Sequence, residues 1–196
     1  CRDAGRGPGE GGGRDVLARV GMRRLELDES VYSVGLKTDA DGGVELDLGA
    51  VGKGFALDKS ADILEEWGLA NYLLSAGGST VLASGLGDEP DGWRVGVGGA
   101  WGAAAGTGTI VLRNEALSGS GKEAKGEHII DPATGIPARG HIAAWSRCPS
   151  GTIADALSTA FMVMSTEQVK AFCAGHEGIS AWLVPPGGGL IAVEAE

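Results

Sequence analysis

The chain has 196 residues and a net charge of −10, with 26 acidic against 16 basic residues. Hydrophobic residues make up 43% and charged residues 21%, as is ordinary for a globular protein, so we expect one domain over residues 15–196. The excess of acidic residues argues against nucleic-acid binding, which requires a basic surface. No run of apolar residues is long enough to span a membrane.

The first 14 residues predict a flexible, Gly-rich head that begins with Cys1. A leading cysteine followed by a tether is typical of a processed bacterial lipoprotein, which would place the protein in the cell envelope or periplasm, lipid-anchored through Cys1. The favoured alternative for Cys1 is a fragment that happens to begin at this residue, and a cytoplasmic location stays open beside the envelope. Cys148 and Cys173 match no zinc or redox spacing, so we expect plain buried thiols.

In chain order, the N-terminal patterns predict a helix end, two alternating strands and one long helix. These elements lie at residues 15–20, 23–27, 44–48 and 55–67. Gly21 and Gly68 are the expected stops of the two helices. Residues 39–43 have the composition of a turn.

Most of the later predicted elements are strands, at residues 71–75, 80–83, 93–97, 109–113, 116–118, 127–130, 142–146, 180–184 and 190–193. Two more helices are predicted over 153–164 and 167–174. Residues 76–78 predict a glycine bulge, and residues 98–108 and 119–126 predict loops. Strands outnumber helices without alternating with them. This pattern favours an α+β fold with a mixed or antiparallel sheet and a few packed helices.

Asp155 and Thr159 lie four residues apart on a predicted helix, so their side chains share one face. A carboxylate and a hydroxyl there can offer oxygen ligands to Mg²⁺, which takes few protein ligands. The alternative is a helix cap with a nearby buried threonine.

A glycine-rich loop, residues 49–54, lies between a predicted strand and a helix, where backbone N–H groups can hold a phosphate. Lys53 adds a cation, although the glycine spacing is not that of a Walker A loop. The alternative is a tight strand–helix turn. Asp47, just before this loop, could bind a ribose or a base, or could cap the turn.

His128 precedes the turn at Asp131 and Pro132, where it can orient a phosphate or accept a hydroxyl proton. The alternative is a structural histidine at the end of a strand. Ser118 opens the stretch 118–121, which we interpret as a ligand-facing turn rather than a nucleophile loop.

The order of these segments resembles the ApbE family of FAD:protein FMN transferases. The matching segments are residues 47–58, 76–78, 93–97, 116–119, 128–135 and 154–159. The resemblance runs from about Asp15 to the C-terminus and implies an ApbE-like, T-fold-like α+β architecture.

The resemblance implies a bacterial, Mg²⁺-dependent enzyme that transfers FMN from FAD to a Thr or Ser hydroxyl of an acceptor protein and releases AMP. It places the metal at Asp155, Thr159 and the backbone carbonyl of Ala50, and gives His128 a role in proton transfer or phosphate orientation. The implied FAD-binding residues are Asp47, Lys53, Gly77, Gly78, Ser118 and Ile129.

Members of the family carry a substantial N-terminal portion before the segment that starts near Asp15, and it supplies part of the flavin pocket. Here a Gly-rich head stands in its place, so the chain is expected to be a fragment or a shortened relative. Two other functions therefore stay open: a non-catalytic flavin- or nucleotide-binding module, and an FAD pyrophosphatase that yields FMN and AMP.

Overall fold

The computed structural model describes residues 17, 20–37, 44–97, 108–122 and 126–194. The chain divides into two compact units, Cys1–Asp47 with Ile130–Pro137 and Leu48–Ile129 with Ala138–Glu196. The expected head, the helix at 15–20, the turn at 39–43 and the loop at 98–108 lie mostly or wholly outside the described residues. A single domain over 15–196 stays a prediction.

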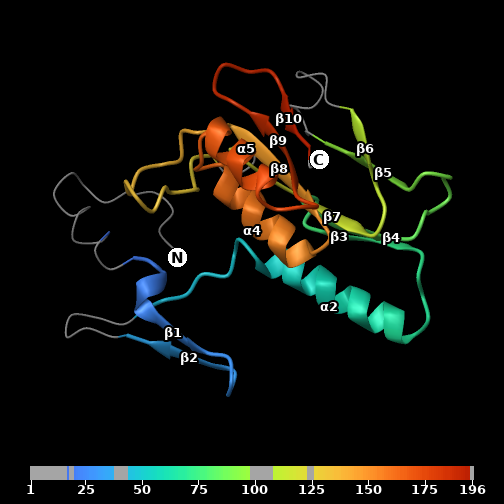
Figure 1. The fold of residues 1–196 in the computed structure, drawn as a ribbon, viewed down its shortest axis with the longest axis horizontal. Coiled ribbons are helices and arrows are strands. Elements are labelled where there is room, and N and C mark those ends of the chain that lie inside the picture. Colours follow the sequence, from blue (N-terminus) through green and yellow to red (C-terminus); the bar gives the residue numbers. More distant parts are fainter. Residues whose placement is uncertain (1–16, 18–19, 38–43, 98–107, 123–125, 195–196) are drawn as a thin grey trace. The chain divides into compact units, whose positions relative to one another are not determined.

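The first unit contains a short hairpin, drawn in blue in Figure 1. A 3-10 turn, η1 (Met22–Arg24), leads into β1 (Leu25–Asp28), which pairs antiparallel with β2 (Ser33–Leu36). The strand predicted at 23–27 therefore starts two residues later than expected. β2 was not predicted; its apolar residues Val34 and Leu36 alternate over only four positions, and all four residues are exposed.

The predicted strand at 44–48 is wrong, because these residues form no strand in the structure. Their alternating pattern buries no face, since all but the partly buried Val44 are exposed. The chain turns at once after them. The carbonyl oxygen of Leu48 accepts hydrogen bonds from the N–H groups of Val51 and Gly52, at 3.1 and 2.8 Å.

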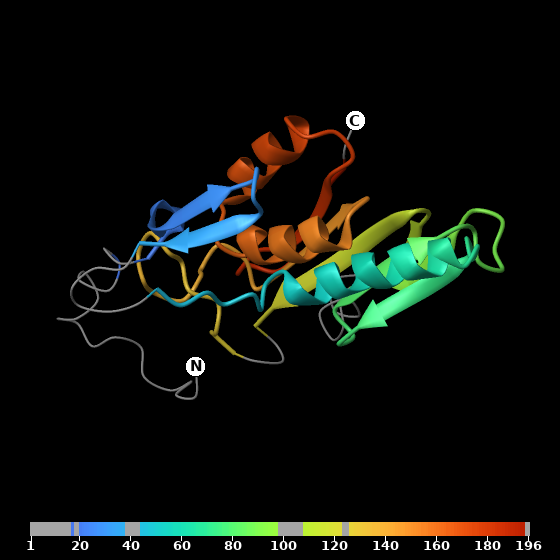
Figure 2. The ribbon, with the colours of Figure 1, turned by 90° about the horizontal axis from the view of Figure 1, so that it is seen from below.

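The second unit is built on a six-stranded antiparallel sheet with the strand order β10-β9-β8-β7-β4-β3. A separate two-stranded sheet pairs β5 with β6. The strands are β3 (Tyr72–Ala76), β4 (Thr80–Ser84), β5 (Trp93–Gly96), β6 (Thr109–Leu112), β7 (Glu115–Gly121), β8 (Ala143–Cys148), β9 (Ser180–Val184) and β10 (Ile191–Val193). The α+β expectation is confirmed (Figures 1 and 2).

Three helices belong to this unit: α2 (Gly52–Glu66), α4 (Gly151–Phe161) and α5 (Thr166–Ala174). All three were predicted, with shifted ends. The shift at α2 matters most, because the helix starts three residues earlier than expected and takes Lys53 into its first turn. None of the helices in the described ranges combines the length and apolar character needed to cross a membrane.

Side chains alternate across the sheet, so its two faces contribute to different core clusters. Leu82 and Ala116 pack with Leu57 of α2, whereas their chain neighbours Ala83 and Leu117 pack in another cluster. That second cluster contains Leu112 of β6 and Trp182 of β9, among other residues. The helices α2 and α4 therefore cover one face, as Figure 2 shows, and the β5–β6 hairpin packs on the opposite face.

The predicted bulge at 76–78 is instead the turn of a β3–β4 hairpin, in which Ala76 pairs with Thr80. Gly77 and Gly78 have φ values of 61° and 69°, and both belong to the left-handed region that a type I′ turn requires. Strand pairing, which a single sequence does not reveal, distinguishes this turn from a bulge.

Two other boundaries differ from expectation. β7 continues to Gly121, so the predicted ligand-facing turn at 118–121 is strand. The strand predicted at 127–130 is wrong and reduces to one isolated bridge between Ile130 and Pro137. Here Asp131 reverses the chain, since its carboxylate accepts hydrogen bonds from the backbone of Ala133 and the hydroxyl of Thr134.

Candidate functional site

A buried carboxylate, Asp155 on α4, is contacted by polar groups from three other elements of the second unit, α2, β4 and β7. The residue is only 1% exposed. Its Oδ1 lies 2.8 Å from Nζ of Lys53, 3.1 Å from Oγ of Ser118 and 3.4 Å from Oγ1 of Thr80. Its Oδ2 accepts a hydrogen bond of 3.1 Å from the N–H of Gly54. The two motif segments of the sequence, 47–58 and 154–159, therefore meet at this carboxylate.

The helices α2 and α4 cap each other. Val51, the N-cap residue of α2, makes no side-chain cap, and Asp155 instead accepts the Gly54 N–H in the first turn. In return, Asp58 of α2 caps the N-terminus of α4. Its donors are the N–H groups of Gly151 and Thr152 and the hydroxyls of Ser150 and Thr152, at 2.7–2.9 Å. Each helix thus places a carboxylate at the positive end of the other.

The pKa of Asp58 reflects this arrangement. Burial alone would raise it, but the hydrogen bonds from Thr152, Gly151 and Ser150 outweigh burial and hold the pKa below its ordinary value. Asp58 is therefore ionised at neutral pH, as a cap of a helix N-terminus should be.

Thr159 lies one turn beyond Asp155 on α4, and the predicted shared face is confirmed by its contacts. Its hydroxyl lies 3.1 Å from the hydroxyl of Ser120 on β7. Ser120 also contacts Ser158 at 2.9 Å, and Ser158 in turn donates to the carbonyl oxygen of Asp155 at 2.9 Å. The hydroxyls of Thr159, Ser120 and Ser158 therefore form a continuous strip, which Ser158 joins at 3.4 Å to Ser118, the serine that contacts the carboxylate.

This donor set fits a hard cation. The described residues hold no group of three or more His, Cys, Asp or Glu side chains, as a zinc site or a carboxylate-rich calcium site would have. One carboxylate with neighbouring hydroxyls from Thr159 and Ser120 suits Mg²⁺, which keeps most of its ligands as water or phosphate. The carbonyl of Ala50, partly buried in the turn before α2, stays a prediction as a ligand.

The structure brings several predicted FAD-binding residues to this place. A Cβ atom at Gly77 would lie 3.5 Å from Cδ of Lys53, whereas one at Gly78 would meet nothing within 4 Å. The β3–β4 turn is therefore beside Lys53, with open space at its second glycine. Ser118 is fully buried and its hydroxyl contacts Asp155, so its side chain supports the carboxylate; its predicted contact with FAD stays a prediction.

His128 is exposed, and its Nδ1 lies 3.1 Å from the carbonyl oxygen of Gly126. Because a carbonyl only accepts, Nδ1 carries the proton, and Nε2 of the neutral ring is left as the basic nitrogen. Ile129 packs against the core cluster that contains Phe161. Asp47 is the last residue of the first unit. The catalytic role of His128 and the FAD contacts of Ile129 and Asp47 stay predictions.

Sequence reasoning missed Thr80 and Ser158, and it included Ser120 only as part of the stretch 118–121. Thr80 carried a local signal, since it follows the glycine turn at the start of β4. The expected buried thiols are confirmed, and burial raises the pKa of Cys148 to about 11, so this cysteine is a poor nucleophile.

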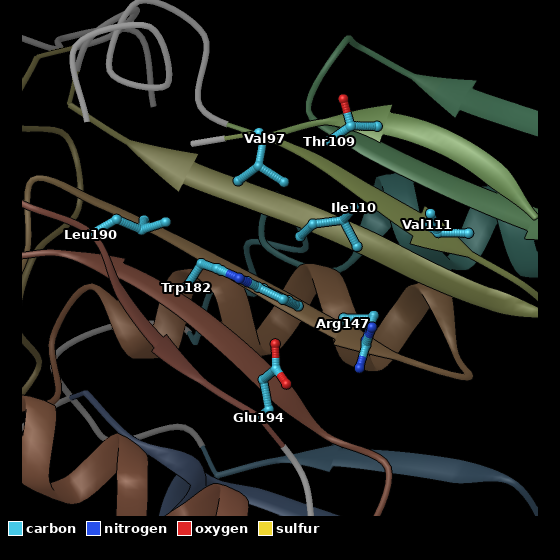
Figure 3. A pocket seen from close by; sticks show the side chains of 9 residues that line it. Val97, Thr109, Ile110, Val111, Arg147, Trp182, Leu190 and Glu194 are labelled. Atoms are coloured by element: carbon cyan, nitrogen blue, oxygen red, sulfur yellow. The ribbon is translucent and has the colours of Figure 1, made fainter. Parts of the chain in front are cut away.

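A half-open cavity lies elsewhere, on the sheet face opposite α2 and α4 (Figure 3). It has a volume of about 340 Å³ and is lined by Val97, Gly108, Thr109, Ile110, Val111, Arg147, Trp182, Leu190 and Glu194. The guanidinium of Arg147 lies 5.4 Å from the ring of Trp182 and contacts Glu115 at 3.3 Å. None of the predicted site residues lines this cavity, so we assign the chemistry to the Asp155 cluster on its donors rather than to the cavity.

Comparison with known proteins gives a family match over nearly the whole chain. The sequence pattern of the ApbE family matches residues 3–183. An FAD:protein FMN transferase of Treponema pallidum is 33% identical over 194 residues, which cover 88% of this chain and 53% of the relative. An FAD:protein FMN transferase of Escherichia coli K12 is 28% identical over 179 residues, which cover 86% of this chain and 50% of that relative. The chain spans about half the length of these two curated relatives.

Solved structures agree with the sequence match. The apo flavinyl transferase ApbE of Pseudomonas stutzeri superposes with a TM-score of 0.79 at 25% identity, covering 97% of this chain and 60% of that one. The ApbE protein of Thermotoga maritima gives a TM-score of 0.74 at 29% identity, covering 92% and 60%.

Proposed function

Because the chain belongs to the ApbE family, we propose that it catalyses Mg²⁺-dependent transfer of FMN from FAD to a Thr or Ser hydroxyl of an acceptor protein, with release of AMP. One observation carries the proposal. Lys53 and Asp155, 102 residues apart in the sequence, meet at 2.8 Å and join the predicted phosphate-binding and metal-binding segments. A cation, a buried carboxylate and a strip of hydroxyls at one place are suited to phosphoryl-type transfer.

The reaction exchanges the phosphoanhydride bond of the FAD diphosphate for a phosphoester bond to the acceptor. The acceptor hydroxyl oxygen attacks the phosphorus atom on the FMN side of the FAD diphosphate and forms the new P–O bond. The bond between this phosphorus and the bridging oxygen breaks, and AMP leaves with that oxygen and the electron pair. The hydroxyl proton passes to a base, which we assign to Nε2 of His128 because the hydrogen bond to Gly126 fixes this tautomer.

Negative charge grows on the diphosphate oxygens as the bond breaks, and the chain offers two kinds of neutralising group. The side chain of Lys53 is 36% exposed, so its ammonium can face a ligand while the carboxylate of Asp155 stays buried. The backbone N–H groups in the first turn of α2 add the positive end of a helix dipole. Asp155, Thr159 and the backbone carbonyl of Ala50 would hold Mg²⁺, with Ser120 beside Thr159 at 3.1 Å. The chemistry of Mg²⁺ there would be to neutralise the diphosphate and activate the AMP leaving group.

The test incubates the protein with FAD, Mg²⁺ and a pooled library of Thr- and Ser-containing peptides, and follows AMP by chromatography and peptide-bound flavin by mass spectrometry. We expect AMP and covalent FMN–peptide to appear together, and only when Mg²⁺ is present. AMP and free FMN formed at the same rate without peptides would instead identify an FAD pyrophosphatase. Bound FAD without any AMP would identify a non-catalytic flavin-binding module.

A further inference from the structure

Lys53 is the counter-ion of a carboxylate that would otherwise be buried without a charge partner. The side chain of Asp155 is 2% exposed, and its partner Lys53 reaches it with Nζ at 2.8 Å while keeping 36% of its own side chain accessible. A buried carboxylate is unfavourable unless it is paired and hydrogen-bonded. In this structure the pairing cation is therefore supplied by the protein itself.

The donors around Asp155 differ sharply in their freedom to move. Thr80 and Ser118 are 0% exposed and are held by the paired strands β4 and β7. The third donor, the N–H of Gly54, is fixed by the backbone of α2. Of the four donors, only Lys53 sits at the end of a long flexible side chain that reaches solvent.

A divalent cation at Asp155 would compete with this ammonium. Two cations cannot occupy the same few ångströms beside one carboxylate without strong repulsion, because a partly buried site screens charge poorly. Displacing the ammonium from Asp155 also costs less free energy than displacing the other donors. The side chain of Lys53 can rotate into water or toward the open glycine turn beside it.

We propose that Lys53 is an exchangeable counter-ion: metal binding displaces its ammonium from Asp155 and so frees it for the diphosphate of the ligand. The proposal rests on the proposed function, because the diphosphate is that of FAD. Metal and lysine then compete for one carboxylate, while metal and diphosphate bind cooperatively, since the metal releases the cation that the diphosphate uses.

The first test uses the wild-type chain and no flavin. Competitive labelling with acetic anhydride, read by mass spectrometry, compares Lys53 with Lys59 in EDTA and in saturating Mg²⁺. Lys59 is a matched control on the same helix, because it pairs with Asp62 at 2.7 Å on the exposed surface. Release from Asp155 should raise the labelling rate of Lys53 by about tenfold, as expected for the loss of one charge-assisted hydrogen bond, with Lys59 unchanged.

The second test measures Mn²⁺ affinity from the free-ion signal in electron paramagnetic resonance, again without flavin. Lys53→Met removes the competitor and should lower the dissociation constant by about tenfold, whereas Lys59→Met should leave it within about twofold. An unchanged or weaker affinity in Lys53→Met would overturn the proposal. If that variant does not fold, the labelling of the wild-type chain decides.

The outcomes separate the two proposals. If the wild-type chain binds Mg²⁺ and Mn²⁺ while Lys53 labelling stays constant, the counter-ion exchange is wrong and the transferase proposal is untouched. If neither ion binds with or without Lys53, the exchange and the metal dependence of the proposed function fail together.

Discussion

Gly54 of α2 and Gly151 of α4 lie so close that a side-chain carbon on Gly54 would collide with the carbonyl oxygen of Gly151. A side chain on Gly151 would clash less severely, because its Cβ atom would lie 2.9 Å from the carbonyl oxygen of Gly54. This contact between two backbones lets the capping carboxylates Asp58 and Asp155 reach the opposite helix. Glycine at both positions therefore sets the geometry of the candidate site.

Gly54→Ala should lower the free energy of unfolding by about 2 kcal/mol or more, because the helices must separate to admit the methyl group. Urea denaturation measures this change. Gly52→Ala is the matched control on the same helix turn, since a Cβ atom there meets nothing within 4 Å and alanine favours a helix. Equal stabilities of the two variants would show that the helix crossing is not as tight as described.

Asp58→Asn should destabilise the protein by about 1–2 kcal/mol, because the N-terminus of α4 loses its charged cap. Asp62→Asn, which alters an exposed pair with Lys59 on the same helix, should stay within about 0.5 kcal/mol of the wild type. Thermal unfolding of both variants at neutral pH measures their stabilities relative to the wild type.

The same cap predicts an acid dependence. The pKa of Asp58 is lowered in the folded state, so its stabilising effect is complete above the unfolded pKa of about 3.9 and is lost as the pH falls through the lower folded value. The stability difference between wild type and Asp58→Asn should therefore be constant near pH 6 and shrink below about pH 4. A difference that grows on acidification would contradict the assignment.

Thr80→Val should cost about 1–3 kcal/mol of stability, because it removes a buried hydroxyl that lies 2.9 Å from Ser118 and supports Asp155. Thr80→Ser keeps the hydroxyl and should recover most of this loss. Chemical denaturation distinguishes the variants. A valine variant as stable as the wild type would contradict the role assigned to the hydroxyl.

His128→Ala should slow FMN transfer by about 10²–10⁴-fold while leaving thermal stability unchanged, because the ring is exposed and would act as the proton acceptor. His176→Ala is a close control, since His176 is also exposed with Nδ1 at a backbone carbonyl, that of Phe172. Unchanged transfer in His128→Ala would remove this histidine from the mechanism.

Sequence patterns predicted best those elements whose structure depends on neighbouring residues in the chain. The apolar spacing of α2 and the stop at Gly68 locate the helix, yet its first turn resembled a loop because Gly52, Lys53 and Gly54 are poor local indicators of a helix. The first turn depends on Asp155, which comes from another helix and has no signature in the neighbouring sequence. Tertiary capping of this kind is invisible to periodicity.

The residues of the candidate site also divide into those that local sequence identifies and those that depend on tertiary pairing. Asp155, Thr159 and Lys53 could be singled out by residue type and motif, and the structure places Lys53 at the carboxylate of Asp155 and the Thr159 hydroxyl near its backbone carbonyl. Thr80 could not be found in this way, because its contact with Ser118 follows from the pairing of β4 with β7. Register, not composition, brings these two hydroxyls under the carboxylate.

The most direct test of the central claim, that the Asp155 cluster binds Mg²⁺ and FAD, is calorimetric titration of FAD into the wild-type chain and into Asp155→Asn, in Mg²⁺ and in EDTA. Asn keeps the shape of the side chain and removes its charge, which spares the fold more than alanine would. We predict binding by the wild type that weakens at least about tenfold in EDTA and a variant that no longer responds to Mg²⁺. Equal FAD affinity in all four titrations would contradict the claim.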